Sequence, residues 1–190
     1  TPKMTSSCKT LVGYTILQFE CTNWRLSHMP TIMQGDGWDY FIMKVDESYV
    51  NQITNSNAVS LHVRRGDYLS DTYKDSFKSL GADYYKNAVN EVYKRIENPT
   101  FFIFSDDKDF INESFDWIEN KVIVEGNAGN RSYIDMYLMS LCRINIIANS
   151  TFSMWAGILN SHEDATVIYP STYMTQKESE VKLLKNWIRI

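Results

Sequence analysis

The sequence contains few cysteines, and their arrangement is uninformative as a motif. Cys8, Cys21 and Cys142 are odd in number and show no C-x-x-C spacing. Cys142 lies inside an apolar run with helical spacing, and we interpret it as a buried thiol. This cysteine usage favours a protein of a reducing compartment.

Long apolar runs are also absent. None approaches the roughly 20 residues that a membrane helix needs, and no signal-peptide pattern is present. We therefore expect a cytoplasmic protein without a transmembrane segment, and leave open a peripheral association with the inner face of the membrane. The sequence begins at Thr1 rather than at a methionine, and we interpret it as a fragment of a longer chain.

The sequence has no excess of basic residues. Its 19 Lys and Arg against 23 Asp and Glu give a net charge of −4, which disfavours a nucleic-acid partner, because such binding needs a broad basic face. Aromatic residues make up 14% of the chain, a share that suits sugar binding and equally suits core packing. A local pair of arginines on an acidic protein points instead to a small phosphorylated ligand.

Strands and helices alternate regularly from residue 58 onward. Short apolar runs predict strands, and apolar residues at helical spacing predict helices. The expected strands are 58–63, 100–104, 121–125, 144–148 and 165–169, and the expected helices are 83–97, 108–118, 132–143 and 149–159. Short connections between them indicate right-handed βαβ units. We therefore predict an α/β domain over 58–190, with a Rossmann-like parallel sheet and flanking helices.

Residues 1–57 form an N-terminal segment that the sequence describes poorly. A strand is expected over 13–19 and a short helix over 46–53. We assign no chemistry to this segment and interpret it as a remnant of another domain or a link to it.

The segment from Leu61 to Tyr68 supplies the first candidate binding loop. Arg64 and Arg65 follow a predicted strand, with Gly66 and Asp67 directly after them. Arginine suits phosphate because its planar guanidinium binds oxygens in pairs and stays charged. The carboxyl ends of strands in such sheets are the usual place for ligands.

Further polar residues follow the other predicted strands. All these loops should meet at one rim of the sheet, together with the N-terminus of a helix, whose N–H groups and dipole favour anions. The arrangement predicts a diphosphate site. The residues expected there are His62, Arg64, Arg65, Asp67, Ser105, Asp106, Asp107, Asp135, Asn149, Ser150, Thr151 and Ser153.

Asp107 and Asp109 offer an alternative chemistry. Together with Lys108 they fit the D-x-D pattern by which some sugar-nucleotide enzymes hold Mg²⁺ or Mn²⁺. The simpler interpretation is that Ser105 or Asp106 caps a helix and that the later acids favour its first turn. Where arginines neutralise a diphosphate no metal is required, and we expect none.

Four separated motifs resemble those of the α-1,2-fucosyltransferase family, particularly its bacterial members. The matching segments are His62–Tyr68, Phe102–Asp107, Asp135–Ser140 and Ala148–Ser153, with a further match at Asn186–Ile188. The resemblance covers roughly residues 57–190. It implies the donor-binding half of a GT-B fold. The acceptor-side half, usually opened by a Gly-Asn-Gln motif, is not found in this sequence.

The resemblance also implies an activity. It is the metal-independent, inverting transfer of L-fucose from GDP-fucose to the 2-hydroxyl of a galactose-containing glycan, without a cofactor. Arg64, with Arg65 second, would stabilise the departing GDP. By analogy with related enzymes, His62 and Asp135 would lie near the nucleoside, and Ser150, Thr151, Phe152 and Ser153 near the phosphates. Asp67 is the nearest candidate for the general base, unless the base belongs to the acceptor half.

Two other functions remain open from the sequence. The first is a GDP-fucose-binding module, inactive because the acceptor domain is lost. The second is a metal-dependent sugar-nucleotide transferase that uses Asp107 and Asp109.

Overall fold

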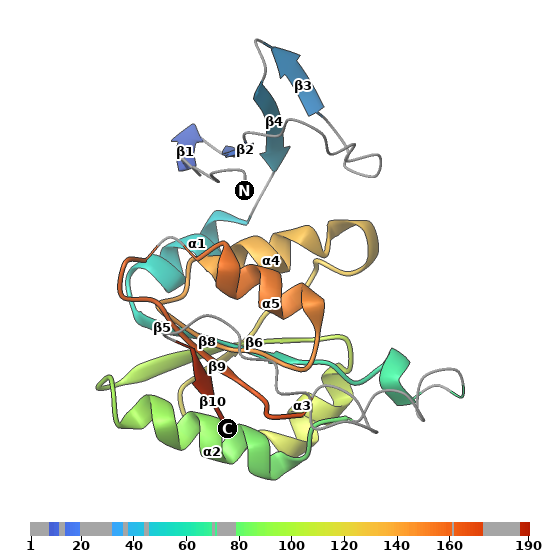
Figure 1. Ribbon diagram of the computed structural model, residues 1–190, viewed down its shortest axis with the longest axis vertical. Coiled ribbons are helices and arrows are strands. Elements are labelled where there is room, and N and C mark those ends of the chain that lie inside the picture. The colour runs from blue at the N-terminus through green and yellow to red at the C-terminus, as the bar shows by residue number, and fades with distance from the viewer. Residues whose placement is uncertain are drawn as a thin grey trace. The chain divides into compact units, whose positions relative to one another are not determined.

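The computed structural model describes the chain over residues 46–69, 71, 79–160, 162–172 and 187–190, together with the backbone of four strands between residues 8 and 43. The side chains of Asp67 and Asn130 lie outside this description. The chain divides into two compact units, residues 1–50 and 51–190. Figure 1 shows the ribbon of both units, which are described separately below.

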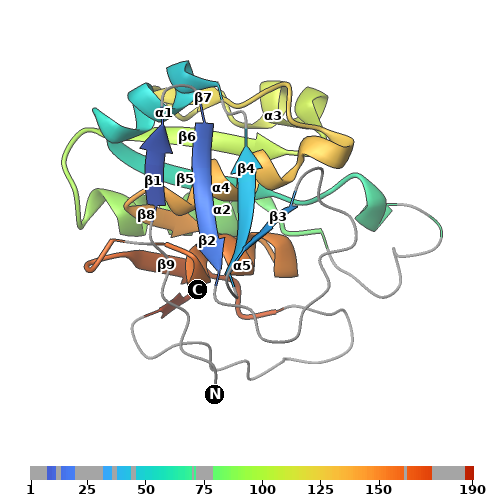
Figure 2. The ribbon, with the colours of Figure 1, turned by 90° about the horizontal axis from the view of Figure 1, so that it is seen from above.

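The N-terminal unit contains a small antiparallel sheet. Its strands are β1 (Cys8–Leu11), β2 (Tyr14–Phe19), β3 (Ile32–Gly35) and β4 (Trp38–Met43). They pair in the order β1-β2-β4-β3, side by side in Figure 2. The strand expected over 13–19 is confirmed as β2, whereas the other three were not predicted.

The chain continues into helix α1 (Glu47–Thr54), which confirms the short helix expected over 46–53. Asp46 lies just before the helix and its carboxylate accepts a hydrogen bond from the backbone N–H of Ser48 at 2.9 Å. This satisfies one of the N–H groups that a helix leaves unpaired at its start. Ile53 is the buried residue of the helix.

The larger unit is built on a six-stranded parallel sheet. Its strands run in the order β10-β9-β8-β5-β6-β7. The central strands are buried on both faces, which explains why they are continuous apolar runs rather than alternating ones. The strand bounds are β5 (Asn57–Val63), β6 (Pro99–Ser105), β7 (Lys121–Ile123), β8 (Ile144–Ile146), β9 (Thr166–Tyr169) and β10 (Ile188–Arg189).

Helices cover both faces of this sheet, which confirms the predicted Rossmann-like α/β fold. Helices α4 (Tyr133–Ser140) and α5 (Thr151–Ile158) lie on one face, and α2 (Ala82–Tyr93) and α3 (Lys108–Ser114) lie on the other (Figure 1). Two short 3₁₀ segments, η1 (Asp67–Leu69) and η2 (Gly129–Arg131), belong to the loops. Among the described helices, none is long and apolar enough to span a bilayer.

The helices end earlier than their apolar patterns predict. The helix expected over 83–97 ends at Tyr93, and Asn98 then takes a positive φ of 48°. Asparagine tolerates this left-handed conformation better than most residues, and the chain turns there before Pro99 opens β6. Apolar residues beyond a helix end still pack against the core, so periodicity alone does not locate the end.

The helix caps differ in part from expectation. Ser150 caps α5, because its hydroxyl accepts a hydrogen bond from the N–H of Phe152. For α3 the prediction of Ser105 or Asp106 was wrong, since Asp107 caps this helix through the N–H of Phe110 at 3.1 Å. The Ser105 hydroxyl instead accepts from the N–H of Asp107 at 3.0 Å, which holds the turn before the cap.

The strand order creates one crevice at the carboxyl ends of the strands. From β5 the chain builds outward through β6 to β7, then returns across the sheet to place β8 on the other side of β5. Leu61 of β5 is aligned with Ile103 of β6 and with Ile146 of β8. In open α/β sheets ligands bind where the strand order reverses, which here is between β5 and β8.

We expect the central strands to dominate the stability of the larger unit. Ile103→Ala removes a fully buried side chain of β6 and should lower the free energy of unfolding by about 2–5 kcal/mol, because a cavity remains. The matched control is Ile158→Ala on α5, where the side chain is 39% exposed and the cost should be roughly 1 kcal/mol or less. Urea unfolding measures both, and equal losses would contradict the assignment of β6 to the core.

Candidate functional site

A cavity of about 720 Å³ lies at the predicted rim of the sheet. Its wall combines loops after β5, β6, β7 and β8, so residues far apart in the sequence meet there. The lining residues are His62, Arg64, Tyr68, Phe104, Ser105, Asp106, Lys108, Val124, Glu125, Gly126, Asn127, Ala128, Gly129, Ser132, Asp135, Ser150, Thr151 and Phe152. The cavity thus occupies the crevice at which the strand order reverses.

Arg64 lines this cavity and is held by the neighbouring loop. Its Nη1 lies 3.0 Å from Oδ2 of Asp106. The other oxygen of Asp106 accepts a hydrogen bond from the backbone N–H of Arg65 at 2.9 Å. A Cβ on Gly66 would meet Asp106 Oδ2 at 3.2 Å, so a glycine at this position lets the two loops approach closely.

Arg65 does not line the cavity, although the sequence placed it beside Arg64. Its Nε lies 3.1 Å from Oδ2 of Asp107, and its Cζ lies 3.9 Å from the ring centroid of Phe110. Both partners belong to the start of α3. The two adjacent guanidinium groups therefore diverge, with Arg64 toward the cavity and Arg65 against the helix.

The carboxylate of Asp107 is already engaged by protein groups. Oδ1 accepts from the N–H of Phe110 and Oδ2 pairs with Arg65, whereas Asp109 is exposed and is not part of the cavity lining. Over the described parts of the chain, no three His, Cys, Asp or Glu side chains come together as a metal site would require. The arrangement gives Asp107 a structural role at the start of α3.

His62 forms the floor of the cavity as a neutral imidazole. Its side chain is 5% exposed, and its ring centroid lies 5.6 Å from that of Phe152. Burial lowers the pKa of His62 to about 4, with Asp106 opposing the shift and Arg64 adding to it. Within the described structure Nδ1 of His62 is buried and has no hydrogen-bond partner. This atom is therefore available to form a hydrogen bond with a ligand.

Asp135, in the first turn of α4, supplies a carboxylate to the cavity. Burial raises its pKa, while the hydrogen bond from Asn127 and the charge of Lys108 act in the opposite direction. The amide of Asn127 donates to Oδ1 of Asp135 at 2.8 Å. Lys108, at the start of α3, pairs with Glu125 at 3.2 Å. The carboxylate of Asp135, held by Asn127, can accept hydrogen bonds from N–H groups of a ligand.

The start of α5 completes the wall. Ser150, Thr151 and Phe152 line the cavity, and the first turn of the helix carries no acidic residue, which leaves its dipole able to attract an anion. Ser153 lies beneath, where its buried hydroxyl donates to the backbone carbonyl of Ser150 at 3.3 Å. Asn149 is also buried, and its carbonyl accepts from the hydroxyl of Tyr68 at 2.9 Å.

The structure thus brings together most, but not all, of the residues expected from the sequence. Those that line the cavity are His62, Arg64, Ser105, Asp106, Asp135, Ser150, Thr151 and Phe152. Four others, Arg65, Asp107, Asn149 and Ser153, lie outside its lining, and the side chain of Asp67 is outside the described residues.

Tyr68, Lys108, Asn127 and Glu125 were not singled out from the sequence, although all four line the cavity. Tyr68 and Lys108 lie in motifs whose function was assigned to other residues, the arginines in the first case and the aspartates in the second. Glu125 is the last residue of the strand expected over 121–125, and Asn127 follows it outside any motif. The order of the predicted strands would have placed Lys108 and Asn127 at this rim, but the contact of Tyr68 with Asn149 depends on tertiary packing.

The buried His62 should make stability depend on pH. The unfolded state binds a proton near pH 6.5 and the folded state only near pH 4, so folding should weaken as pH falls from 6.5 to about 4. The loss should amount to about 3 kcal/mol at most. In urea unfolding across this window His62→Gln should flatten the dependence, whereas His162→Gln, which changes an exposed ring, should keep it. Parallel curves for wild type and His62→Gln would refute this effect.

Comparison with known proteins places the chain in a family. Residues 42–190 match the model of glycosyl transferase family 11. The O-antigen biosynthesis glycosyltransferase WbnK of Escherichia coli is 35% identical over 137 residues, covering 72% of this chain and 45% of the relative. The mouse galactoside 2-alpha-L-fucosyltransferase Sec1 is 30% identical over 148 residues, covering 74% and 40%.

A structural likeness is also found. The crystal structure of the NodZ alpha-1,6-fucosyltransferase soaked with GDP-fucose has a TM-score of 0.48 at 17% identity, covering 64% of this chain and 44% of that one. The chain spans about half the length of the curated relatives it matches. The match of the family model over most of the sequence shows that this chain belongs to glycosyl transferase family 11.

Proposed function

We propose that this chain carries the donor-binding half of a GT-B fucosyltransferase. The whole protein would transfer L-fucose from GDP-fucose to the 2-hydroxyl of a galactoside, with inversion and without a metal. The observation that carries this proposal is the meeting of Arg64 and the start of α5 in one cavity at the reversal of strand order. The name of the mouse relative, a galactoside 2-alpha-L-fucosyltransferase, supports this choice of sugar and acceptor.

The diphosphate of the donor would bind between Arg64 and the start of α5. Arg64 offers a permanent positive charge in the cavity, and the helix adds its dipole and the hydroxyls of Ser150 and Thr151. Ser105 lines the same space. Arg65, Asn149 and Ser153 would support these groups from behind rather than touch the ligand, since they do not line the cavity.

The nucleoside would lie toward His62 and Asp135. Guanine carries N–H groups on its pairing edge, which a carboxylate such as Asp135 accepts well. The neutral His62 can offer a ring face and the lone pair or N–H of Nδ1 without adding charge. Asn127 would keep Asp135 in a single orientation through its 2.8 Å hydrogen bond.

The reaction would break the bond between the fucose C1 and the β-phosphate oxygen, and form a bond from C1 to the acceptor oxygen. Negative charge grows on the departing GDP, where Arg64 would stabilise it. Asp106 would position Arg64 through its ion pair at 3.0 Å rather than bind the diphosphate, which it would repel. The proton of the acceptor hydroxyl would pass to a general base. We propose Asp67, or a group of the acceptor half, for this role.

The same site also fits an alternative function, a GDP-binding module that lacks transfer activity. Isothermal titration calorimetry with GDP tests the site itself, and absence of binding would refute both functions. Transfer of fucose from GDP-fucose to lactose, measured with this chain and with the full-length protein, separates enzyme from module.

Arg64→Ala should weaken GDP binding by roughly tenfold or more, since a charged hydrogen-bond donor to the diphosphate is lost. In an active full-length protein it should cost about 3–4 kcal/mol of transition-state stabilisation. The matched control is Arg143→Ala, which removes an exposed arginine paired with Asp164 and should leave GDP binding unchanged. A GDP affinity of Arg64→Ala equal to that of wild type would rule out the proposed role.

Binding of GDP should not need a divalent cation. We expect equal affinity in the presence of EDTA and of Mn²⁺, because Arg64 and the helix start supply the positive field and the oxygens of Asp107 are occupied. Asp109→Asn should behave like wild type in both conditions. Binding that vanishes with EDTA, returns with Mn²⁺ and is lost in Asp109→Asn would favour the metal-dependent transferase instead.

A further inference from the structure

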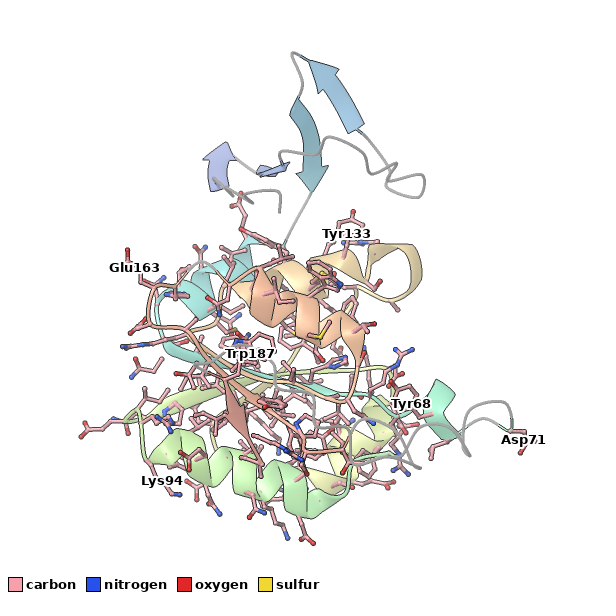
Figure 3. The ribbon with its side chains drawn as sticks, in the orientation of Figure 1. Tyr68, Asp71, Lys94, Tyr133, Glu163 and Trp187 are labelled. Atoms are coloured by element: carbon pink, nitrogen blue, oxygen red, sulfur yellow. The ribbon has the colours of Figure 1, made fainter. Side chains whose placement is uncertain are left out.

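Tyr68 connects the two loops that carry the candidate anion-binding groups. It lies in η1, close to the point where the chain leaves β5 (Figure 3). Its hydroxyl donates to the backbone carbonyl of Asn149 at 2.9 Å, across 81 residues of sequence. The side chain is 8% exposed, so water competes little for this hydrogen bond and its loss would leave a buried carbonyl acceptor without this donor.

The ring of Tyr68 also lies beside Arg64. Cζ of Arg64 is 5.9 Å from the ring centroid, within the range of a cation–π contact. Asp106 holds the same guanidinium through Nη1. The orientation of Arg64 in the cavity is therefore set by a ring and a carboxylate that come from two different loops.

The acceptor of the Tyr68 hydroxyl lies at the start of the second anion-binding element. Asn149 directly precedes Ser150, the capping residue of α5. One side chain thus contacts Arg64 through its ring and fixes the backbone at the start of α5 through its hydroxyl. Tyr68 thus bridges these two elements.

We propose that Tyr68 is a positioning residue that matches the distance between Arg64 and the start of α5 to a diphosphate. The inference rests on the proposed function, in which GDP contacts both Arg64 and α5. A diphosphate must reach both elements at once, so its affinity depends on their separation. A monophosphate contacts one element at a time and depends on that separation much less.

Calorimetry with GDP and GMP on the chain as it stands provides the test. Tyr68→Phe keeps the ring beside Arg64 and removes only the hydroxyl. We expect GDP binding to weaken by roughly five- to tenfold and GMP binding to change by about twofold or less, in keeping with one buried hydrogen bond. The ratio of the two dissociation constants is the readout, because a general loss of stability would not change it selectively.

Tyr84, in the first turn of α2, offers a matched control. Its hydroxyl lies 2.6 Å from the carbonyl of Ile147 and 3.3 Å from that of Ile168. Like Tyr68 it thus donates to the backbone just after β8, but Tyr84 does not line the cavity. Tyr84→Phe should therefore leave the GDP to GMP ratio as in wild type. Melting temperatures of both variants show whether the two lost hydrogen bonds cost similar stability.

The outcomes separate the inference from the function on which it rests. Wild-type protein that binds no GDP overturns both. Wild-type binding with an unchanged ratio in Tyr68→Phe, or an equal fall of the ratio in Tyr84→Phe, overturns the role of Tyr68 and leaves the function standing. If Tyr68→Phe is unfolded at the assay temperature, the same titrations are run at a lower temperature at which it is folded, and the same selective loss of GDP binding is expected.

Discussion

The carboxylate of Asp106 is the contact on which the candidate site depends. It accepts the backbone N–H of Arg65 with one oxygen and pairs with the side chain of Arg64 through the other. It therefore fixes both the path of the loop after β5 and the direction of the arginine that enters the cavity. Gly66 permits this approach, because a larger residue would press on Asp106 Oδ2 at 3.2 Å. The loops after β5 and β6 act as one unit as a result.

The adjacent arginines have different tasks because their partners differ in position. Arg64 meets Asp106 at the rim, while Arg65 meets Asp107 and the ring of Phe110 at the start of α3. Asp107 is at the same time the cap of that helix. Arg65 thereby ties the first loop to a rigid helix, which limits the movement of the backbone that carries Arg64. Arg65 therefore supports the loop that carries Arg64, while its own side chain lies outside the cavity lining.

The sequence alone was sufficient to predict the parallel sheet and much of the residue set at the carboxyl ends of its strands. Residues 101–104 of β6 are buried on both faces and form an unbroken apolar run. In addition, the carboxyl ends of parallel strands must share an edge of the sheet. These two facts place His62, Arg64, Asp106 and Ser150 together. The strands β1, β3 and β4 escaped prediction because their short segments show no clear alternation. The direction of Arg65, the cap of α3 and the contact of Tyr68 with Asn149 depend on which partner lies within reach, and a linear pattern does not contain that information.

Four charged side chains of the cavity lining form ion pairs with one another before any ligand arrives. Arg64 faces Asp106, and Lys108 faces Glu125. A diphosphate that binds here must share or displace these carboxylates, so part of the attraction between Arg64 and the ligand is offset by the weakened ion pair. The same pairing orients Arg64 in advance, which lowers the cost of ordering a long side chain on binding. In the proposed transferase GDP would be the product, and an arginine that returns to Asp106 would stabilise the leaving group during transfer and still release it afterwards.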